Sequence, residues 1–243
     1  MRDQRKLIHR WDWDFLIILD ACRADVFEDV CGIRGYYERV RSPAPCTVLW
    51  LERTFTGFYD VVYVSANPFV NSKGRLPHVR FDATKHFAEI VDVWDFGWDE
   101  ANGTVPPKHV NYAVKRLISN GSAKKMIIHY IQPHFPYIGD RKFLEIDAKW
   151  SMDEFRYAVP KPNERIRWAI KAGIVTVEDL KNAYRNNLRL VLRYVRKLLD
   201  HLEGKVVITS DHGELLGEDG LFLHECHYNH PILRTVPWLE IKL

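Results

Sequence analysis

The chain has 243 residues, of which 47% are hydrophobic and 28% are charged, and its formal net charge is +3. These values are ordinary for a soluble globular protein with a large core. The small charge gives no reason to expect a nucleic acid partner, and it would not repel an anionic substrate.

Cysteine usage and the N-terminal sequence bear on the compartment. The four cysteines, Cys22, Cys31, Cys46 and Cys226, show no C-x-x-C spacing. The N-terminal residues are charged and do not resemble a signal peptide, and the longest apolar run, residues 15–19, has only the length of a strand. We therefore expect reduced thiols, a cytoplasmic location and no membrane span.

Strand-like and helical patterns alternate along the chain. In chain order they predict a strand at 15–20, a helix at 24–32, a strand at 36–42, a helix at 47–57, strands at 60–67 and 89–94, a helix at 106–119, a strand at 124–134, a helix at 176–204, and strands at 205–210 and 235–243. The longest helix has Thr176 as its predicted N-cap and Gly204 as its predicted C-cap. The final strand contains a proline, which favours an edge position.

Two stretches interrupt the alternation. Residues 68–88 and 139–175 contain prolines and mixed patterns, so we expect them to be insertions that shape a pocket. The remaining elements predict a single α/β domain over residues 1–243, built around a mostly parallel sheet.

Chemistry-bearing side chains follow two of the predicted strands. Asp20 ends the strand at 15–20, and Asp211 and His212 follow the β-branched-rich run 206–209 and Ser210. Carboxylate and imidazole groups at the carboxyl ends of strands lie where α/β folds place ligand and metal sites. Thr47 stands at the start of a predicted helix, a position suited to an anion, and a metal can activate its hydroxyl as a nucleophile. Together these residues predict a metal-dependent enzyme that transfers phosphoryl or sulfuryl groups.

Each of these residues also has a purely structural interpretation. Asp20 fits a cap of the following helix, and Thr47 fits a helix N-cap. Asp211 and His212 fit an ordinary turn. We prefer the metal site because the acids, the imidazole and the hydroxyl occur together.

Four segments resemble motifs of a known family. They are LDACRADVF (19–27), SPAPCTVLWLERTFTG (42–57), QPHFPYIG (132–139), and TSDHGELLGEDGLFLH (209–224) with RTVPWL (234–239). In this order and spacing they resemble the alkaline phosphatase–sulfatase superfamily, in its sulfatase-like branch with a threonine nucleophile. The resemblance covers almost the whole chain and implies a three-layer sandwich, with helices on both faces of the sheet.

The resemblance also implies roles for single residues. Asp20, Thr47, Asp211 and His212 would be metal ligands, and Thr47 would be the nucleophile. The implied metal is Zn²⁺ or Mn²⁺, with one ion expected and a second allowed.

Further residues are candidates for contact with the substrate. The resemblance places His134 at the substrate oxyanion, and His224 is a second candidate for this role or for a second metal. Arg23 is expected to stabilise transition-state charge or to serve as scaffold, and Asn67 lies at the end of a predicted strand, where an oxyanion contact is possible. His129 lies within a strand and is assigned to the core.

The nucleophile position favours phosphate over sulfate. Sulfatases of this family carry Cys or Ser in a C-x-P-S-R-type context, whereas Thr47 is followed by Val48, Leu49 and Trp50. We therefore expect a hydrolase or transferase of phosphomonoesters or phosphodiesters. A sulfate-ester hydrolase and a non-catalytic protein that binds anions or glycans are the alternatives. The expected partner is a small-molecule, glycan-linked or lipid-linked anionic ester, and the sequence does not indicate an oligomeric state.

Overall fold

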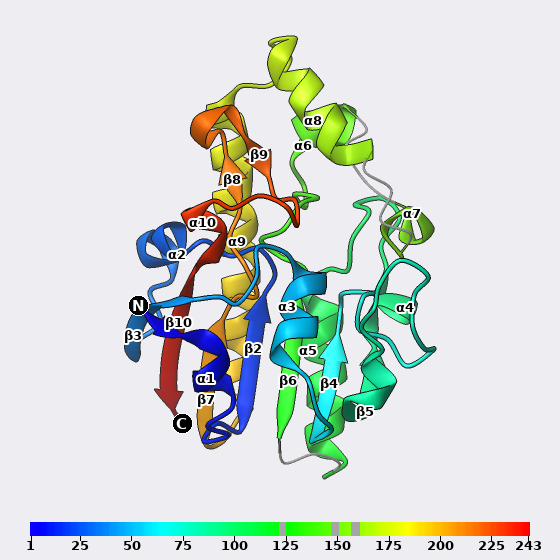
Figure 1. The fold of residues 1–243 in the computed structure, drawn as a ribbon, viewed down its shortest axis with the longest axis vertical. Helices are drawn as coiled ribbons and strands as arrows, with labels where there is room; N and C mark the ends of the chain where they lie inside the picture. The colour runs from blue at the N-terminus through cyan, green and yellow to red at the C-terminus, as the bar shows by residue number, and fades with distance from the viewer. Residues whose placement is uncertain (122–124, 147–150, 157–160) are drawn as a thin grey trace.

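The computed structural model describes residues 1–121, 125–146, 151–156 and 161–243 (Figure 1). Its central sheet has eight strands in the order β1-β3-β10-β7-β2-β6-β4-β5. In that order the strands are β1 (Arg2–Asp3), β3 (Tyr36–Arg41), β10 (Thr235–Lys242), β7 (Lys205–Thr209), β2 (Phe15–Leu19), β6 (Met126–Tyr130), β4 (Tyr59–Ser65) and β5 (Phe87–Asp92). Among the described strands of this central sheet, only β10 runs antiparallel to its neighbours. The prediction of a mostly parallel sheet is confirmed.

The middle of the sheet explains why the apolar runs are continuous. Every residue of β2 and β6 is buried, as are the last four residues of β7. Strands covered on both faces need apolar side chains on both faces, so they show no alternation. Because these three strands are parallel, their carboxyl ends meet at one edge of the sheet.

The predicted edge position of the last strand is wrong. β10 lies between β3 and β7 and pairs with both. Its proline, Pro237, precedes Trp238, which is the first residue that pairs with β7. The proline is therefore tolerated where the pairing with β7 has not yet begun.

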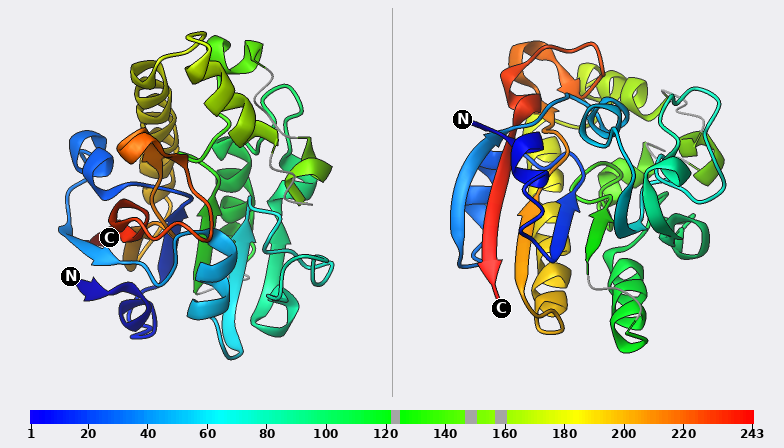
Figure 2. Two further views of the ribbon diagram at one scale, coloured as in Figure 1. Left: turned by 45° about the horizontal axis from the view of Figure 1, so that its top comes forward. Right: turned by 60° about the horizontal axis from the view of Figure 1, so that its bottom comes forward.

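Helices cover both faces of the sheet and confirm the predicted three layers (Figure 2). On one face lie α2 (Ala24–Val30), α5 (Pro107–Ser119) and α9 (Val177–Leu199). On the other lie α1 (Gln4–Ile8) and α3 (Thr47–Thr54). Each layer has its own apolar cluster against the sheet, as expected for a domain whose helices bury one stripe each.

The longest helix begins as predicted and ends early. Thr176 is the N-cap of α9, and its side chain and that of Asp179 form a reciprocal capping box. The helix ends at Leu199 with Asp200 as its C-cap, so the predicted C-cap at Gly204 is wrong. Gly204 instead has a φ of +106° in the turn before β7, where a side chain would collide with the Asp14 carboxylate.

The two predicted insertions occupy different places. Residues 68–88, which include the short helix η1 (Ala83–Lys85), bury Val70, Val79 and Phe81 against the same sheet face as α3. Part of 139–175 lies outside the described residues. Its described part includes α6 (Arg141–Glu145), α7 (Met152–Arg156) and α8 (Lys161–Lys171).

Several short elements stand beside the carboxyl edge of the sheet (Figure 1). They are β8 (Leu215–Leu216), η2 (Glu218–Gly220), β9 (Phe222–Leu223) and α10 (Pro231–Arg234), while α4 (Val93–Gly97) follows β5. None of the described helices combines the length and the apolar composition needed to cross a bilayer.

Candidate active site and metal centre

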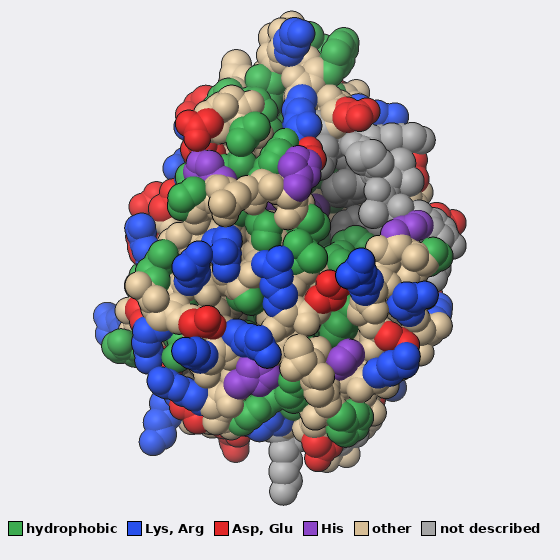
Figure 3. Space-filling view, in the orientation of Figure 1, with side chains coloured by type: hydrophobic (Ala, Val, Ile, Leu, Met, Phe, Trp, Pro, Cys, Tyr) green, Lys and Arg blue, Asp and Glu red, His purple; other side chains and the backbone are tan. Residues whose placement is uncertain are grey.

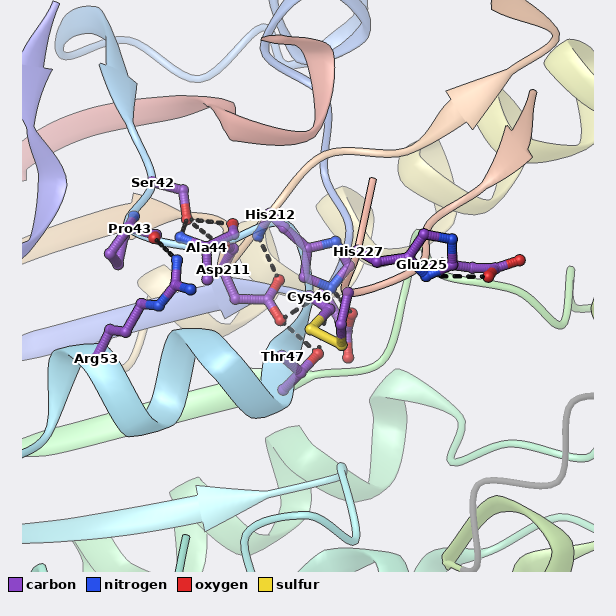
Figure 4. Close-up of a disulfide and its surroundings, with 12 residues drawn as sticks. Ser42, Pro43, Ala44, Cys46, Thr47, Arg53, Asp211, His212, Glu225 and His227 are labelled. Atoms are coloured by element: carbon purple, nitrogen blue, oxygen red, sulfur yellow. Dashed lines mark hydrogen bonds and ion pairs between the residues drawn. A yellow bond between two sulfur atoms is a disulfide. The ribbon is translucent and has the colours of Figure 1, made fainter. Parts of the chain in front are cut away.

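The structure brings the four predicted metal ligands together at the carboxyl edge of the sheet. Asp20 follows β2, Asp211 and His212 follow β7, and Thr47 is the first residue of α3. Thr47 Oγ1 lies 2.7 Å from Asp211 Oδ2 and 3.2 Å from His212 Nε2 (Figure 4). His212 Nε2 lies 3.5 Å from Asp20 Oδ1 and 3.3 Å from Asp211 Oδ2. One hydroxyl, one imidazole nitrogen and two carboxylates thus converge on a common point.

The backbone at Thr47 decides between two interpretations of this residue. Cys46 is the N-cap of α3, and Thr47 is the first helical residue, so the N-cap interpretation of Thr47 is wrong. Its hydroxyl therefore points to Asp211 and His212 instead of capping its own helix. The first N–H groups of a helix have no intrahelical acceptor, and they are suited to an oxyanion.

Burial makes this set of charges costly unless a cation balances it. Asp20, Asp211 and His212 are each at most 1% exposed. Asp20 Oδ1 has no hydrogen-bond donor among the described residues. Two buried carboxylates, one of them with an unsatisfied oxygen, need a counter-charge at this point.

The histidine is oriented for coordination. His212 Nδ1 lies 2.8 Å from the carbonyl oxygen of Gly213, so this nitrogen carries the proton and Nε2 presents its lone pair to the carboxylates. Carboxylate and hydroxyl oxygens with one imidazole nitrogen suit a Zn²⁺ or Mn²⁺ ion. The residues present therefore fit the metal that the sequence predicts.

The ionisation of Asp20 agrees with this arrangement. Burial by itself opposes its charged form, but the interactions of its carboxylate with the imidazole groups of His134, His129 and His212 outweigh that effect. The pKa of Asp20 is consequently held well below its usual range. Asn67 donates a hydrogen bond of 2.8 Å to Asp20 Oδ2, which places Asn67 on the metal ligand and not at an open oxyanion position.

His129 belongs to the site, although its position within a strand assigned it to the core. It is fully buried in β6, and its Nε2 lies 3.7 Å from Asp20 Oδ2. Its Nδ1 is 2.8 Å from the hydroxyl of Tyr63 on β4. His129, Asp20 and Asp211 also have ligand atoms close enough to share an ion. The available signal was a polar residue in an otherwise apolar strand, one position before that strand ends.

A second group of possible ligands lies beside the first. His134, Glu214 and His224 offer ligand atoms within 4.8 Å of one another. The ring of His224 lies 4.1 Å from that of His212, measured between centroids, and its Nδ1 is 2.8 Å from Glu214 Oε1. Burial raises the pKa of Glu214 to about 8 and lowers those of His134 and His224. Sequence reasoning singled out the two histidines and missed Glu214, although it follows Asp211 by three residues.

The contacts of Arg23 favour a scaffold role. Its guanidinium binds Asp25 in a bidentate pair and lies 2.6 Å from Glu218 Oε1. It also donates to the carbonyl oxygen of Glu214 at 3.3 Å. Arg23 therefore connects the helix after Asp20 with the segment after His212, and its charge is already matched by two carboxylates.

The expectation of reduced thiols is wrong for one pair of cysteines. Cys46 and Cys226 form a disulfide, with a sequence separation of 180 (Figure 4). Cys22 and Cys31 are free and buried. The disulfide joins the residue before Thr47 to the segment that carries His224. Because the two cysteines come from opposite ends of the chain, their spacing gave no indication of the bond.

Comparisons with known proteins fit this geometry. No family model matches the chain. A curated relative, the low-salt glycan biosynthesis sulfotransferase Agl7 of Haloferax volcanii, is 27% identical in an alignment of 229 residues that covers 85% of this chain and 47% of that protein. The chain thus spans about half the length of the curated relative that it matches.

Solved structures match at the level of the fold. The soluble domain of lipooligosaccharide phosphoethanolamine transferase A from Neisseria meningitidis has a TM-score of 0.60 and 20% identity, over 94% of this chain and 76% of that one. The periplasmic domain of EcEptC from Escherichia coli, in complex with Zn, has a TM-score of 0.57 and 11% identity, over 94% and 72%. A putative sulfatase from Bacteroides thetaiotaomicron has a TM-score of 0.53 and 12% identity, over 96% of this chain and 64% of that one. The chain has the fold of the alkaline phosphatase–sulfatase superfamily.

Proposed function

We propose that the protein is a metal-dependent hydrolase or transferase of phosphate esters with Thr47 as its nucleophile. The observation that carries this proposal is the position of the Thr47 hydroxyl, 2.7 Å from Asp211 and 3.2 Å from His212 in a buried set of acids. A threonine with a purely structural role at a helix start does not need Asp211 and His212 beside its hydroxyl oxygen. A threonine nucleophile needs such groups, because its hydroxyl must lose a proton.

The geometry suggests how the residues act. The Thr47 hydroxyl donates to Asp211 Oδ2, which directs the lone pairs of Oγ1 outward and receives the proton. Oγ1 attacks the phosphorus in line, the new O–P bond forms, and the bond to the leaving oxygen breaks. Asp20, Asp211 and His212 would hold a divalent ion, which would lower the pKa of the Thr47 hydroxyl and neutralise the non-bridging oxygens. Water or an acceptor alcohol then takes the group from the threonine.

The remaining residues orient the reacting groups. Asn67 and His129 hold Asp20, and Gly213 fixes the tautomer of His212. His134 and His224 flank the same point and would contact the transferred group or hold a second ion.

A substrate panel tests the nucleophile. Purified protein loaded with Zn²⁺ or Mn²⁺ is assayed on an aryl phosphate, an aryl phosphodiester and an aryl sulfate. Thr47→Ala should abolish turnover, Thr47→Ser should retain part of it, and mass spectrometry of the quenched protein should find a phosphoryl group on Thr47. Thr54→Ala is the matched control, because Thr54 is a buried threonine on the same helix. Full activity of Thr47→Ala would refute the assignment.

Sulfate transfer is the second candidate function. It is favoured by the name of the Haloferax volcanii relative, which is a sulfotransferase of glycan biosynthesis. Turnover of the aryl sulfate alone would select it over phosphate chemistry. A protein that turns over no ester and holds no metal after loading would instead be a binding module on the same fold.

The substrate class and the compartment remain proposals. The names of the relatives support a glycan-linked or lipid-linked anionic ester, since they include a glycan biosynthesis enzyme and a lipooligosaccharide transferase. The cytoplasmic location stays a prediction, but the Cys46–Cys226 disulfide removes part of its basis. Such bonds persist mainly in oxidising compartments.

A further inference from the structure

The short helix α10 (Pro231–Arg234) is bound to both segments that carry the site. Gly213 donates its backbone N–H to the carbonyl oxygen of Leu233 at 2.9 Å, and Ser42 donates to that of Arg234 at 2.9 Å. The Ser42 hydroxyl also bonds to the carbonyl oxygen of Asp211. At Gly213 the approach is so close that a Cβ would lie 2.2 Å from the oxygen of Ile232. The position of α10 is therefore coupled to that of the metal ligands.

Three arginines surround this junction. Arg41 ends β3 and pairs in register with Thr235, the first residue of β10. Arg234 is the last residue of α10, and its Nε donates to the Ser42 carbonyl oxygen at 3.0 Å. Arg53, in the last turn of α3, donates to the Pro43 carbonyl oxygen at 2.7 Å. Backbone carbonyls thus hold two of the guanidiniums on the segment that leads to the nucleophile.

The positive charge of these arginines is not matched by bonded acids. In the part of the chain that the structure describes, none of the three forms an ion pair with a carboxylate. The nearby carboxylate of Asp3 raises the pKa of Arg234, but its effect is smaller than the opposing effects of burial and of the neighbouring arginines. Burial, followed by the charges of Arg41 and Arg53, lowers the pKa of Arg234. Figure 3 shows Lys and Arg side chains gathered on the face where α3 and α10 lie.

A cavity adjoins this group. It has a volume of about 370 Å³, and Arg41, His230 and Arg234 are among the residues that line it. A cavity of this size accepts one phosphate or sulfate group with a part of the molecule that carries it. The guanidinium is planar and presents five N–H donors, so Arg53 and Arg234 keep donors for an oxyanion after their bonds to backbone carbonyls.

We propose that Arg41 and Arg234, with the charge of Arg53 beside them, form a subsite for a second phosphate or sulfate group of the same substrate whose ester reacts at Thr47. The inference rests on the proposed function and narrows its substrate class to glycans or lipids that carry at least two anionic groups. The segment from Ser42 to Thr47 links the two places, and five extended residues span at most about 18 Å. A flexible molecule with two phosphates can therefore reach both.

The test compares two probes that differ in one phosphate. Octane-1,8-diol bisphosphate and octyl phosphate, below its micelle concentration, are titrated calorimetrically into the full chain carrying Thr47→Ala. The bisphosphate should bind about tenfold more tightly, as expected for added charge-assisted hydrogen bonds. Arg234→Gln and Arg41→Gln should each remove most of this preference, and Arg41→Gln should leave the affinity for octyl phosphate unchanged. Arg41→Gln is the variant that should fold normally, because Arg41 is exposed at the end of a strand.

The control and the competing outcomes separate the possibilities. Arg189→Gln makes the same charge change on α9, on the other face of the sheet, and should keep the preference. The proposal would be overturned if the Thr47→Ala protein with all its arginines bound the two probes with equal affinity. It would also be overturned if Arg189→Gln lost the preference for the bisphosphate as fully as Arg234→Gln. Inorganic phosphate is titrated as a third probe. If it binds in an Arg234-dependent way without any preference for the bisphosphate, the cluster binds free anions and the substrate assignment is wrong. Because binding is measured without turnover, these results stand apart from the test of Thr47 as nucleophile.

Discussion

Removal of the Cys46–Cys226 disulfide should cost the protein a large part of its stability. The bond closes a loop with a sequence separation of 180 in a chain of 243 residues. In the chain-entropy model a loop of this length stabilises the folded state by about 5 kcal/mol, and measured disulfides fall between about 0 and 5 kcal/mol. We expect a loss of about 3 to 5 kcal/mol, against a total of about 5 to 15 kcal/mol for a typical domain.

Urea unfolding, followed by tryptophan fluorescence, measures this loss. The double variant Cys46→Ala/Cys226→Ala and the wild type in reductant should unfold at the same, lower urea concentration. Thiol titration of the unfolded wild type should find two free thiols before reduction, Cys22 and Cys31, and four after it. Cys22→Ala is the matched control, since it removes a buried thiol that is not in the bond. Four thiols before reduction, or an unchanged unfolding midpoint in the double variant, would refute the reasoning.

Three further results are expected. Asp25 and Glu218 have lowered pKa values: burial opposes this shift, and the bonds to Arg23 outweigh it. The stability they add is present above their unfolded pKa values, near 4, and is lost as the pH falls below them. In urea titrations, Glu218→Gln should weaken the dependence of the unfolding free energy on pH between pH 6 and 3. Chelation should lower the melting temperature, and reloading should restore it, because a ligand of the folded state at a thousandfold excess over its Kd adds about 4 kcal/mol; an identical temperature with chelator would speak against a metal at this site. His129→Gln should weaken metal binding about 10- to 100-fold in calorimetry without a change in circular dichroism, as loss of an outer partner of Asp20 does elsewhere; an unchanged affinity would return His129 to the core.

The parts of the fold that could be predicted are those with local signals. The central strands β2, β6 and β7 are short, continuous apolar runs, and a strand covered on both faces needs no other information. The start of α9 was equally readable, because a capping box is formed by residues three positions apart. The order of the strands was not readable. β10 pairs with β3, almost 200 residues earlier in the chain, and its proline suggested an edge instead.

The site divides in the same way. Asp20, Asp211 and His212 were predictable because each lies within three residues of the end of a strand, and the geometry of a parallel sheet brings strand ends together. His129 and Glu214 were missed because their role depends on neighbours from other elements. His129 reaches Asp20 across two paired strands, and Glu214 reaches His224 across a hairpin. A carboxylate or imidazole in such a place looks like an ordinary core or turn residue until the partner is known.

The contacts of α10 connect the reaction with the choice of substrate. Ser42 bonds to α10 through its backbone and to Asp211 through its side chain, so one residue fixes both the arginine cluster and a metal ligand. Thr47 follows five positions later and is bound through Cys46 to the segment after His224. A substrate phosphate that displaces α10 would therefore also displace Asp211, because Ser42 is hydrogen-bonded to both. For this reason a substrate with its second anionic group in place should be held in one orientation relative to Thr47, whereas a substrate with a single charge lacks that constraint.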